Sequence, residues 1–157
     1  MGRDLAAAET AAARVLTKAD DILGFPLSGL MAEGPEDLLT ATNNAQPAIL
    51  AHSVAALEVA RNRIGPVACA AGHSLGEFTA HVAAGTMTFE EALIAVRHRG
   101  ELMYQAGQEK AGTMAAVLGL DDCTVEEVCR GVDIGVCQIG NFNSDGQVVI
   151  SGDIKGV

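Results

Sequence analysis

The sequence predicts an α/β fold built in two parts, and three observations support this. An apolar run at residues 66–71 is followed by Gly-His-Ser-Leu-Gly at residues 72–76 and then by a helical pattern. From Gly112 onward, short apolar runs alternate with one helix signal and with turn residues. A chain of 157 residues that is 49% hydrophobic can build a core, and with only 3% aromatic residues much of its packing falls to alanine.

The first predicted element is a helix over residues 4–23. Its apolar residues recur at helical spacing and fall on one side: Leu5, Ala8, Ala12, Val15 and Leu16. Residues 51–57 show a second amphipathic pattern, so we expect His52 on a helix as well.

Residues 66–71 predict a short buried strand, which would place Cys69 in the core as a small apolar residue. Residues 78–84 predict a helix that ends at Gly85. Ser74 therefore falls at a strand-to-helix turn, where a nucleophilic serine is usually presented.

The two glycines of the Gly-x-Ser-x-Gly pattern have a steric explanation. A side chain at Gly72 or Gly76 is expected to crowd the tight bend. The turn would direct the backbone N–H of Leu75 toward the site of a developing oxyanion. The pattern points to acyl transfer on Ser74, although a strand-to-helix turn with a serine N-cap would give the same pentapeptide.

A capping box predicts the next helix. Thr88 and Glu91 have the Thr-x-x-Glu spacing, so a helix should begin near Phe89 and run to about Gln105. Its apolar or small face comprises Phe89, Ala92, Leu93, Val96, Gly100 and Met103.

Two arginines take different positions on this helix. Arg99 falls at the edge of the apolar face, whereas Arg97 falls well away from its centre. An unpaired buried charge is costly, so the Arg99 guanidinium needs a partner, and a bound carboxylate would be one. The alternative is that its stem covers the core while its head reaches water or a structural carboxylate.

The C-terminal part predicts about half of a small ferredoxin-like unit, a two-layer fold in which a helix covers a sheet. Its expected elements, in order, are a strand at 113–118, a helix capped by the Thr-Val-Glu-Glu segment at 124–127, a strand at 136–139, a turn at 143–146 and a strand at 148–150. Residues 109–112 are the best boundary, which gives domains of 1–110 and 111–157.

Several segments together resemble one enzyme family. The hexapeptide at 72–77, the Gln-Pro-Ala segment at 44–50, the arginine segment at 99–103 and the Asn-rich turn at 141–152 occur in the order found in malonyl-CoA:acyl-carrier-protein transacylases. The expected fold class is thus α/β: a hydrolase-like large subdomain with a parallel sheet and a nucleophile elbow, plus part of a ferredoxin-like small subdomain.

The resemblance implies a reaction and assigns roles. Ser74 would hold the malonyl group as an ester and pass it to the phosphopantetheine thiol of acyl carrier protein, with the Leu75 N–H at the oxyanion. Arg99 would bind the free malonyl carboxylate, which acetyl-CoA lacks. The matching segments would place Gln46, Asn141 and Asn143 in the substrate site. Malonyl-CoA enters as a substrate, and no cofactor is expected.

The sequence provides no clear general base for Ser74. The chain has four histidines, and none is well placed by sequence to take the Ser74 proton: His52, His73, His81 and His98. In the family this base comes from a later segment, which here would fall beyond Val157. The family's Gly-Gln-Gly loop would likewise precede Met1, so we expect these residues to be a fragment.

Composition and charge limit the expected binding partners and the expected cellular compartment. A net charge of −10 argues against nucleic-acid binding. The four cysteines form no metal-ligand spacing, and no apolar run is long enough for a membrane span or a secretory signal. A reducing cytoplasm is the simplest expected setting.

Two other functions remain open from sequence. Serine hydrolases also use Gly-x-Ser-x-Gly, and Asp145-Gly146 matches the patatin Asp-Gly dyad, although it looks more like a hairpin turn. The other is an inactive module that binds acyl-CoA or a carrier protein without turnover.

Overall fold

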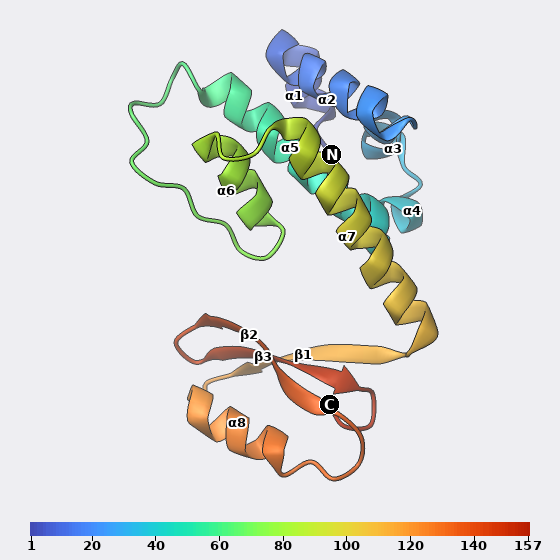
Figure 1. Cartoon of the computed structure of the whole chain (residues 1–157), viewed down its shortest axis with the longest axis vertical. Helices are drawn as coiled ribbons and strands as arrows, with labels where there is room; N and C mark the ends of the chain where they lie inside the picture. The colour runs from blue at the N-terminus through green and yellow to red at the C-terminus, as the bar shows by residue number, and fades with distance from the viewer. The chain divides into compact units, whose positions relative to one another are not determined.

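The computed structural model describes residues 1–157 and divides them into two compact units, Met1–Gln105 and Ala106–Val157. The first unit is helical, and the second contains the sheet (Figure 1). The chain therefore combines helices and strands, as an α/β protein does. None of its helices has both the length and the apolar character that crossing a bilayer requires.

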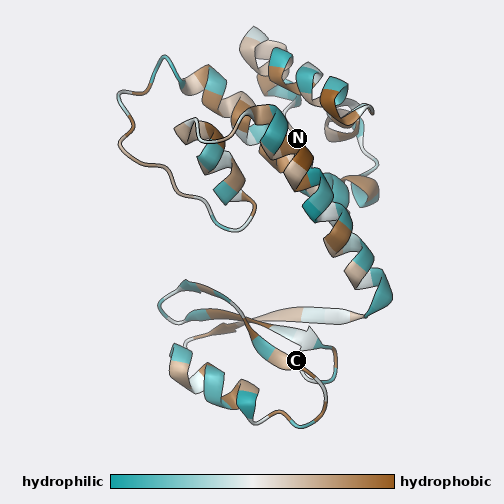
Figure 2. Cartoon of the chain, in the orientation of Figure 1, coloured by the Kyte–Doolittle hydropathy of each residue, from teal (hydrophilic) through white to brown (hydrophobic).

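The predicted N-terminal helix is two helices, α1 (Arg3–Ala8) and α2 (Thr10–Leu23). Glu9 is extended, with φ −130° and ψ 111°, and separates them. The break allows Leu5 on α1 to pack against the same core as α2. Tertiary packing thus overrides the helix propensity of an alanine-rich segment. Figure 2 shows hydrophobic and hydrophilic residues sharing α2, as in an amphipathic helix.

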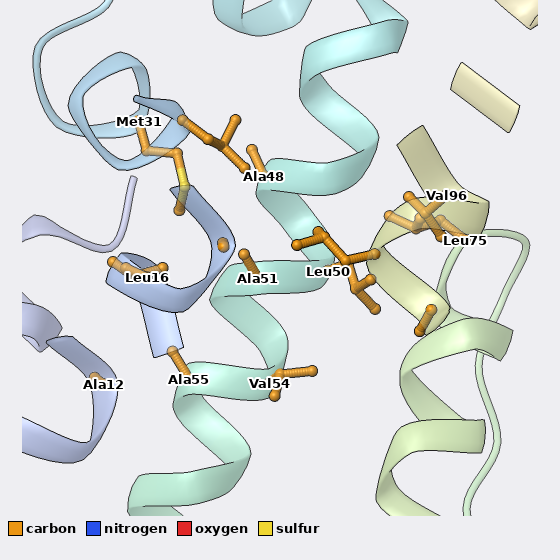
Figure 3. Close-up of a cluster of buried hydrophobic side chains, with 14 residues drawn as sticks. Ala12, Leu16, Met31, Ala48, Leu50, Ala51, Val54, Ala55, Leu75 and Val96 are labelled. Atoms are coloured by element: carbon orange, nitrogen blue, oxygen red, sulfur yellow. The ribbon is translucent and has the colours of Figure 1, made fainter. Parts of the chain in front are cut away.

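Helix α5 (Thr42–Ala60) is the centre of the first unit, following the short helices α3 (Leu27–Glu33) and α4 (Glu36–Thr40). Five of its apolar residues are buried: Ala48, Leu50, Ala51, Val54 and Ala55. In Figure 3, Ala51 and Ala55 face α2, while Leu50 points toward Leu75 and Val96. This core anchors the residue that follows Ser74.

The predicted strand at residues 66–71 is wrong as secondary structure. These residues are exposed and belong to no helix or strand, and Cys69 is exposed rather than part of the core. A strand is stable only when its backbone groups pair with a neighbour, and the first unit contains no other strand.

The two helices after the serine begin and end largely as predicted. Helix α6 (Gly76–Ala84) ends at Gly85, which has a left-handed φ of 73°. Helix α7 (Phe89–Glu109) follows the capping box: the Glu91 N–H donates to Thr88 Oγ1 at 3.2 Å, and the Thr88 N–H donates to Glu91 Oε2 at 2.8 Å.

The second unit is a three-stranded antiparallel sheet in the order β1-β3-β2, and the helix α8 (Asp122–Arg130) packs against β2 and β3. The strands are β1 (Gly112–Leu118), β2 (Cys137–Ser144) and β3 (Gln147–Asp153). Its core comprises Val125, Cys129 and Val148.

The cap of α8 (Asp122–Arg130) differs from the prediction. Asp121 is the N-cap, and it accepts the Thr124 N–H at 2.9 Å; Thr124 is therefore inside the helix. An aspartate with an extended backbone three residues earlier competes successfully for the capping position. Asp145 and Gly146 form the turn between β2 and β3, as in a hairpin.

Candidate active site

Ser74 lies at a strained turn immediately before α6. Its φ of 52° makes it the only non-glycine residue with a positive φ. A non-glycine residue in the left-handed region is uncommon and is concentrated at functional sites. The Ser74 side chain is exposed, so the turn presents the hydroxyl to solvent.

The two glycines of the turn are not equivalent. A Cβ built on Gly72 would lie 2.0 Å from the carbonyl carbon of Gly76, so only glycine fits there. A Cβ on Gly76 would meet nothing within 4 Å, and the expected crowding at that position is wrong. The bend brings the backbone of residue 76 against residue 72, which leaves the Cβ direction at Gly76 open.

The backbone N–H and the side chain of Leu75 lie in different environments. The short turn bonds begin with the Gly76 N–H, which donates to the His73 carbonyl at 2.8 Å, and they leave the Leu75 N–H outside the ladder. The Leu75 side chain is only 9% exposed and belongs to the core. The role of the Leu75 N–H at an oxyanion stays a prediction. The packing of the Leu75 side chain, which the sequence does not indicate, fixes the turn to α5 and α7 (Figure 3).

The structure brings Arg99 and Ser74 together. Arg99 Nη2 on α7 donates to Ser74 Oγ at 3.0 Å, and Arg99 Nη1 donates to Gln46 Oε1 on α5. A cation beside the hydroxyl favours negative charge on that oxygen. The three side chains therefore form one connected cluster.

Gly100 explains how α5 and α7 approach closely enough to form this cluster. A Cβ on Gly100 would lie 2.8 Å from the Thr42 carbonyl oxygen and 2.9 Å from Asn43 Cα. The small residue lets the start of α5 pack directly on α7. The sequence placed Gly100 on the packed face of its helix, but it gave no sign of this partner.

Arg97 belongs to a different network. Arg97 Nη1 donates to the Asn43 carbonyl and to Asn44 Oδ1, each at 2.8 Å, and Arg97 Nε donates to Glu101 Oε1 at 2.6 Å. The guanidinium also lies 5.1 Å from the centre of the Phe25 ring. These contacts assign Arg97 to holding helices together.

The histidines are spread over the first unit. His73 is exposed beside Ser74, and His98 is exposed on α7. His52 is half-buried on α5, and His81 Nδ1 lies 2.8 Å from Thr86 Oγ1. The Ser74 hydroxyl accepts a hydrogen bond from Arg99 Nη2 at 3.0 Å.

Asn141 and Asn143 lie on β2 in the second unit. Asn141 is half-buried and pairs with Val149, and Asn143 Nδ2 donates to Gln147 Oε1 at 3.3 Å. Their role in substrate binding stays a prediction. No group of three or more His, Cys, Asp or Glu side chains gathers as a metal site would require.

The family model that describes the acyl transferase domain matches residues 1–157 of this chain. The chain belongs to the acyl transferase domain family. It is 43% identical to the malonyl CoA-acyl carrier protein transacylase of Bacillus subtilis (strain 168) over 159 residues, which cover 100% of this chain and 50% of that protein.

Solved structures of malonyltransferases also resemble this chain. The chain superposes on an acyl-carrier-protein-S-malonyltransferase from Bartonella henselae with a TM-score of 0.91 and 44% identity, covering 99% of this chain and 51% of the other. The chain also superposes on a malonyl-transacylase in complex with a type II PKS acyl-carrier protein, with a TM-score of 0.92 and 40% sequence identity. This match covers 99% of this chain and 51% of the other. The chain thus spans about half the length of the relatives it matches.

Proposed function

We propose that this acyl transferase domain takes a malonyl group from malonyl-CoA onto Ser74 and passes it to the phosphopantetheine thiol of acyl carrier protein, in fatty-acid synthesis. The observation that carries the proposal is the 3.0 Å contact between Arg99 Nη2 and Ser74 Oγ. A guanidinium at this position is within reach of the free carboxylate of a malonyl group bound to the serine. The names of the relatives support the same substrate and acceptor.

In the first half-reaction, Ser74 Oγ attacks the thioester carbonyl, and the C–S bond to CoA breaks. The Ser74 proton leaves through a general base and is returned to the CoA thiolate. The Leu75 N–H donates to the oxyanion of the tetrahedral intermediate. In the second half-reaction, the thiol of the carrier protein attacks the seryl ester and the bond from the acyl carbon to Ser74 Oγ breaks. The thiol proton passes through the general base to Ser74 Oγ and restores the hydroxyl.

The proposal includes selectivity for malonyl over acetyl groups and a cellular compartment. Arg99 would hold the malonyl carboxylate through charge-assisted hydrogen bonds that an acetyl group cannot make. Roles in substrate recognition are also proposed for Gln46 in the first unit and for Asn141 and Asn143 in the second unit. The proposed chemistry needs no cofactor. The proposed setting is a reducing cytoplasm, in which the four cysteines would stay as free thiols.

Intact-mass spectrometry of the purified protein tests the proposal. After incubation with malonyl-CoA, we expect a malonyl adduct that disappears when acyl carrier protein is added. The Ser74→Ala variant should form none, and an adduct on that variant would place the nucleophile elsewhere.

Two results would replace the proposal. An adduct that forms equally from neutral esters and is discharged to water would indicate a serine hydrolase. Binding of malonyl-CoA without any adduct would indicate a module that binds without turnover.

A further inference from the structure

The amide of Gln46 is buried and oriented by two contacts. The residue is 7% exposed, and its Nε2 donates to Thr42 Oγ1 at 2.8 Å and to Met103 Sδ at 3.3 Å. Both contacts use the NH₂ end of the amide. The carbonyl end of the amide is left to face Arg99. The contacts with Thr42 and Met103 therefore fix the orientation of the Gln46 side chain.

Both acceptors of Arg99 in this cluster are neutral. Gln46 Oε1 accepts from Nη1, and Ser74 Oγ accepts from Nη2. By contrast, Arg97 on the same helix is paired with the carboxylate of Glu101 at 2.6 Å. The Arg99 contacts thus orient its guanidinium without cancelling its charge.

We infer that Gln46 is a positioning residue that selects for acidic acyl groups, because it holds Arg99 through a neutral oxygen and leaves the positive charge for the substrate. A carboxylate at the same place would make the same hydrogen bond but would compete with the substrate for the cation. The inference rests on the proposed function and changes the role of Gln46: it acts through Arg99 rather than by touching the substrate.

The sharpest test is Gln46→Glu, which keeps the size and the acceptor and adds a negative charge. We expect kcat/KM for malonyl loading to fall about tenfold or more, mainly through KM, and to fall much more than kcat/KM for acetyl loading. Gln108→Glu is the matched control, because it adds the same charge at an exposed position of α7. Melting temperatures of both variants check that the fold is retained.

Two outcomes would overturn the inference. Malonyl loading by Gln46→Glu equal to that of the unchanged protein would show that the charge at position 46 is irrelevant. An equal loss of malonyl and acetyl loading would reduce Gln46 to a packing role.

Binding of free malonate and acetate separates this inference from the proposed function, since neither anion can acylate Ser74. By calorimetry, we expect the unchanged protein to prefer malonate, and Gln46→Glu to lose at least about tenfold in malonate affinity. That result would support the inference even in a protein that transfers no acyl group. Equal malonate affinity in the two proteins would contradict it.

Discussion

Two sides of α7 carry arginines that are two residues apart and differ in every contact. Arg97 reaches a carboxylate, a main-chain carbonyl, an amide and an aromatic ring, all of them structural groups. Arg99 reaches a glutamine oxygen and the hydroxyl of a strained serine. Two residues correspond to a rotation of about 200° around a helix, so one helix can present the same side chain to two separate environments.

The structural role of Arg97 originates in α5. Pro47 lies inside that helix and has no N–H to donate to the Asn43 carbonyl four residues earlier. Arg97 Nη1 donates to this carbonyl instead. The acceptors around a guanidinium, rather than its place on a helix, therefore decide whether its charge is available to a ligand.

Gly100→Ala should have the largest effect, because it disturbs both arginine networks at once. The added Cβ would lie 2.8 Å from the Thr42 carbonyl oxygen and force α5 away from α7. We expect a loss of about 3 kcal/mol in the free energy of unfolding and a clear drop in malonyl loading.

Gly107→Ala is the control for this prediction. It lies on the same helix, and a Cβ there meets nothing within 4 Å. Its stability should be unchanged or higher by about 0.5–1 kcal/mol in chemical denaturation. Equal destabilisation by the two substitutions would contradict the close approach of α5 and α7.

Arg97→Ala should reduce stability without changing the choice of acyl group. It leaves the Asn43 carbonyl and the Asn44 amide oxygen without their donor, which should cost about 2 kcal/mol in the free energy of unfolding. Denaturant titration measures this loss. The ratio of malonyl to acetyl loading should stay the same, and a shift in that ratio would remove the distinction between the two arginines.

The smallest predicted effect on stability is at the N-terminal cap of α7, the helix that carries both arginines. Hydrogen bonds from the Thr88 N–H and hydroxyl lower the pKa of Glu91 below its ordinary 4.5. The folded state therefore binds the Glu91 proton more weakly than the unfolded state. This contribution to stability is present above the ordinary pKa and is lost as the pH falls through the lowered value.

Thermal melting between neutral and acidic pH checks this prediction with Glu91→Gln. The variant should melt below the unchanged protein at neutral pH, and the difference should shrink on acidification. A difference that stays constant with pH would show that the Glu91 charge does not contribute to the cap.

Local signals in the sequence were sufficient for several elements. The capping box at Thr88 located the start of α7, and Gly85 marked the end of α6, because both features depend on residues only a few positions apart. The prediction of a strand at residues 66–71 is wrong for the opposite reason. A strand requires a pairing partner, and its own sequence does not contain one. The break at Glu9 likewise depends on packing.

The site shows the same division. The Gly-x-Ser-x-Gly pattern indicated the serine turn, and helical spacing put Arg99 at the edge of a packed face. The contact between Arg99 and Gln46 joins residues that are 53 positions apart, and it depends on the packing of Gly100 against the start of α5. No periodic pattern carries that information, and only the family resemblance linked the two segments.

The ratio of malonyl to acetyl loading in Arg99→Ala decides whether Arg99 is the carboxylate anchor. Intact-mass spectrometry with equal concentrations of malonyl-CoA and acetyl-CoA would give this ratio for the unchanged protein, Arg99→Ala and Arg97→Ala. We expect Arg99→Ala to lower the ratio by about 100-fold, with acetyl loading kept or raised, while Arg97→Ala leaves the ratio unchanged. An unchanged ratio in Arg99→Ala, or an equal loss of both substrates, would contradict the assignment of Arg99 as the carboxylate anchor.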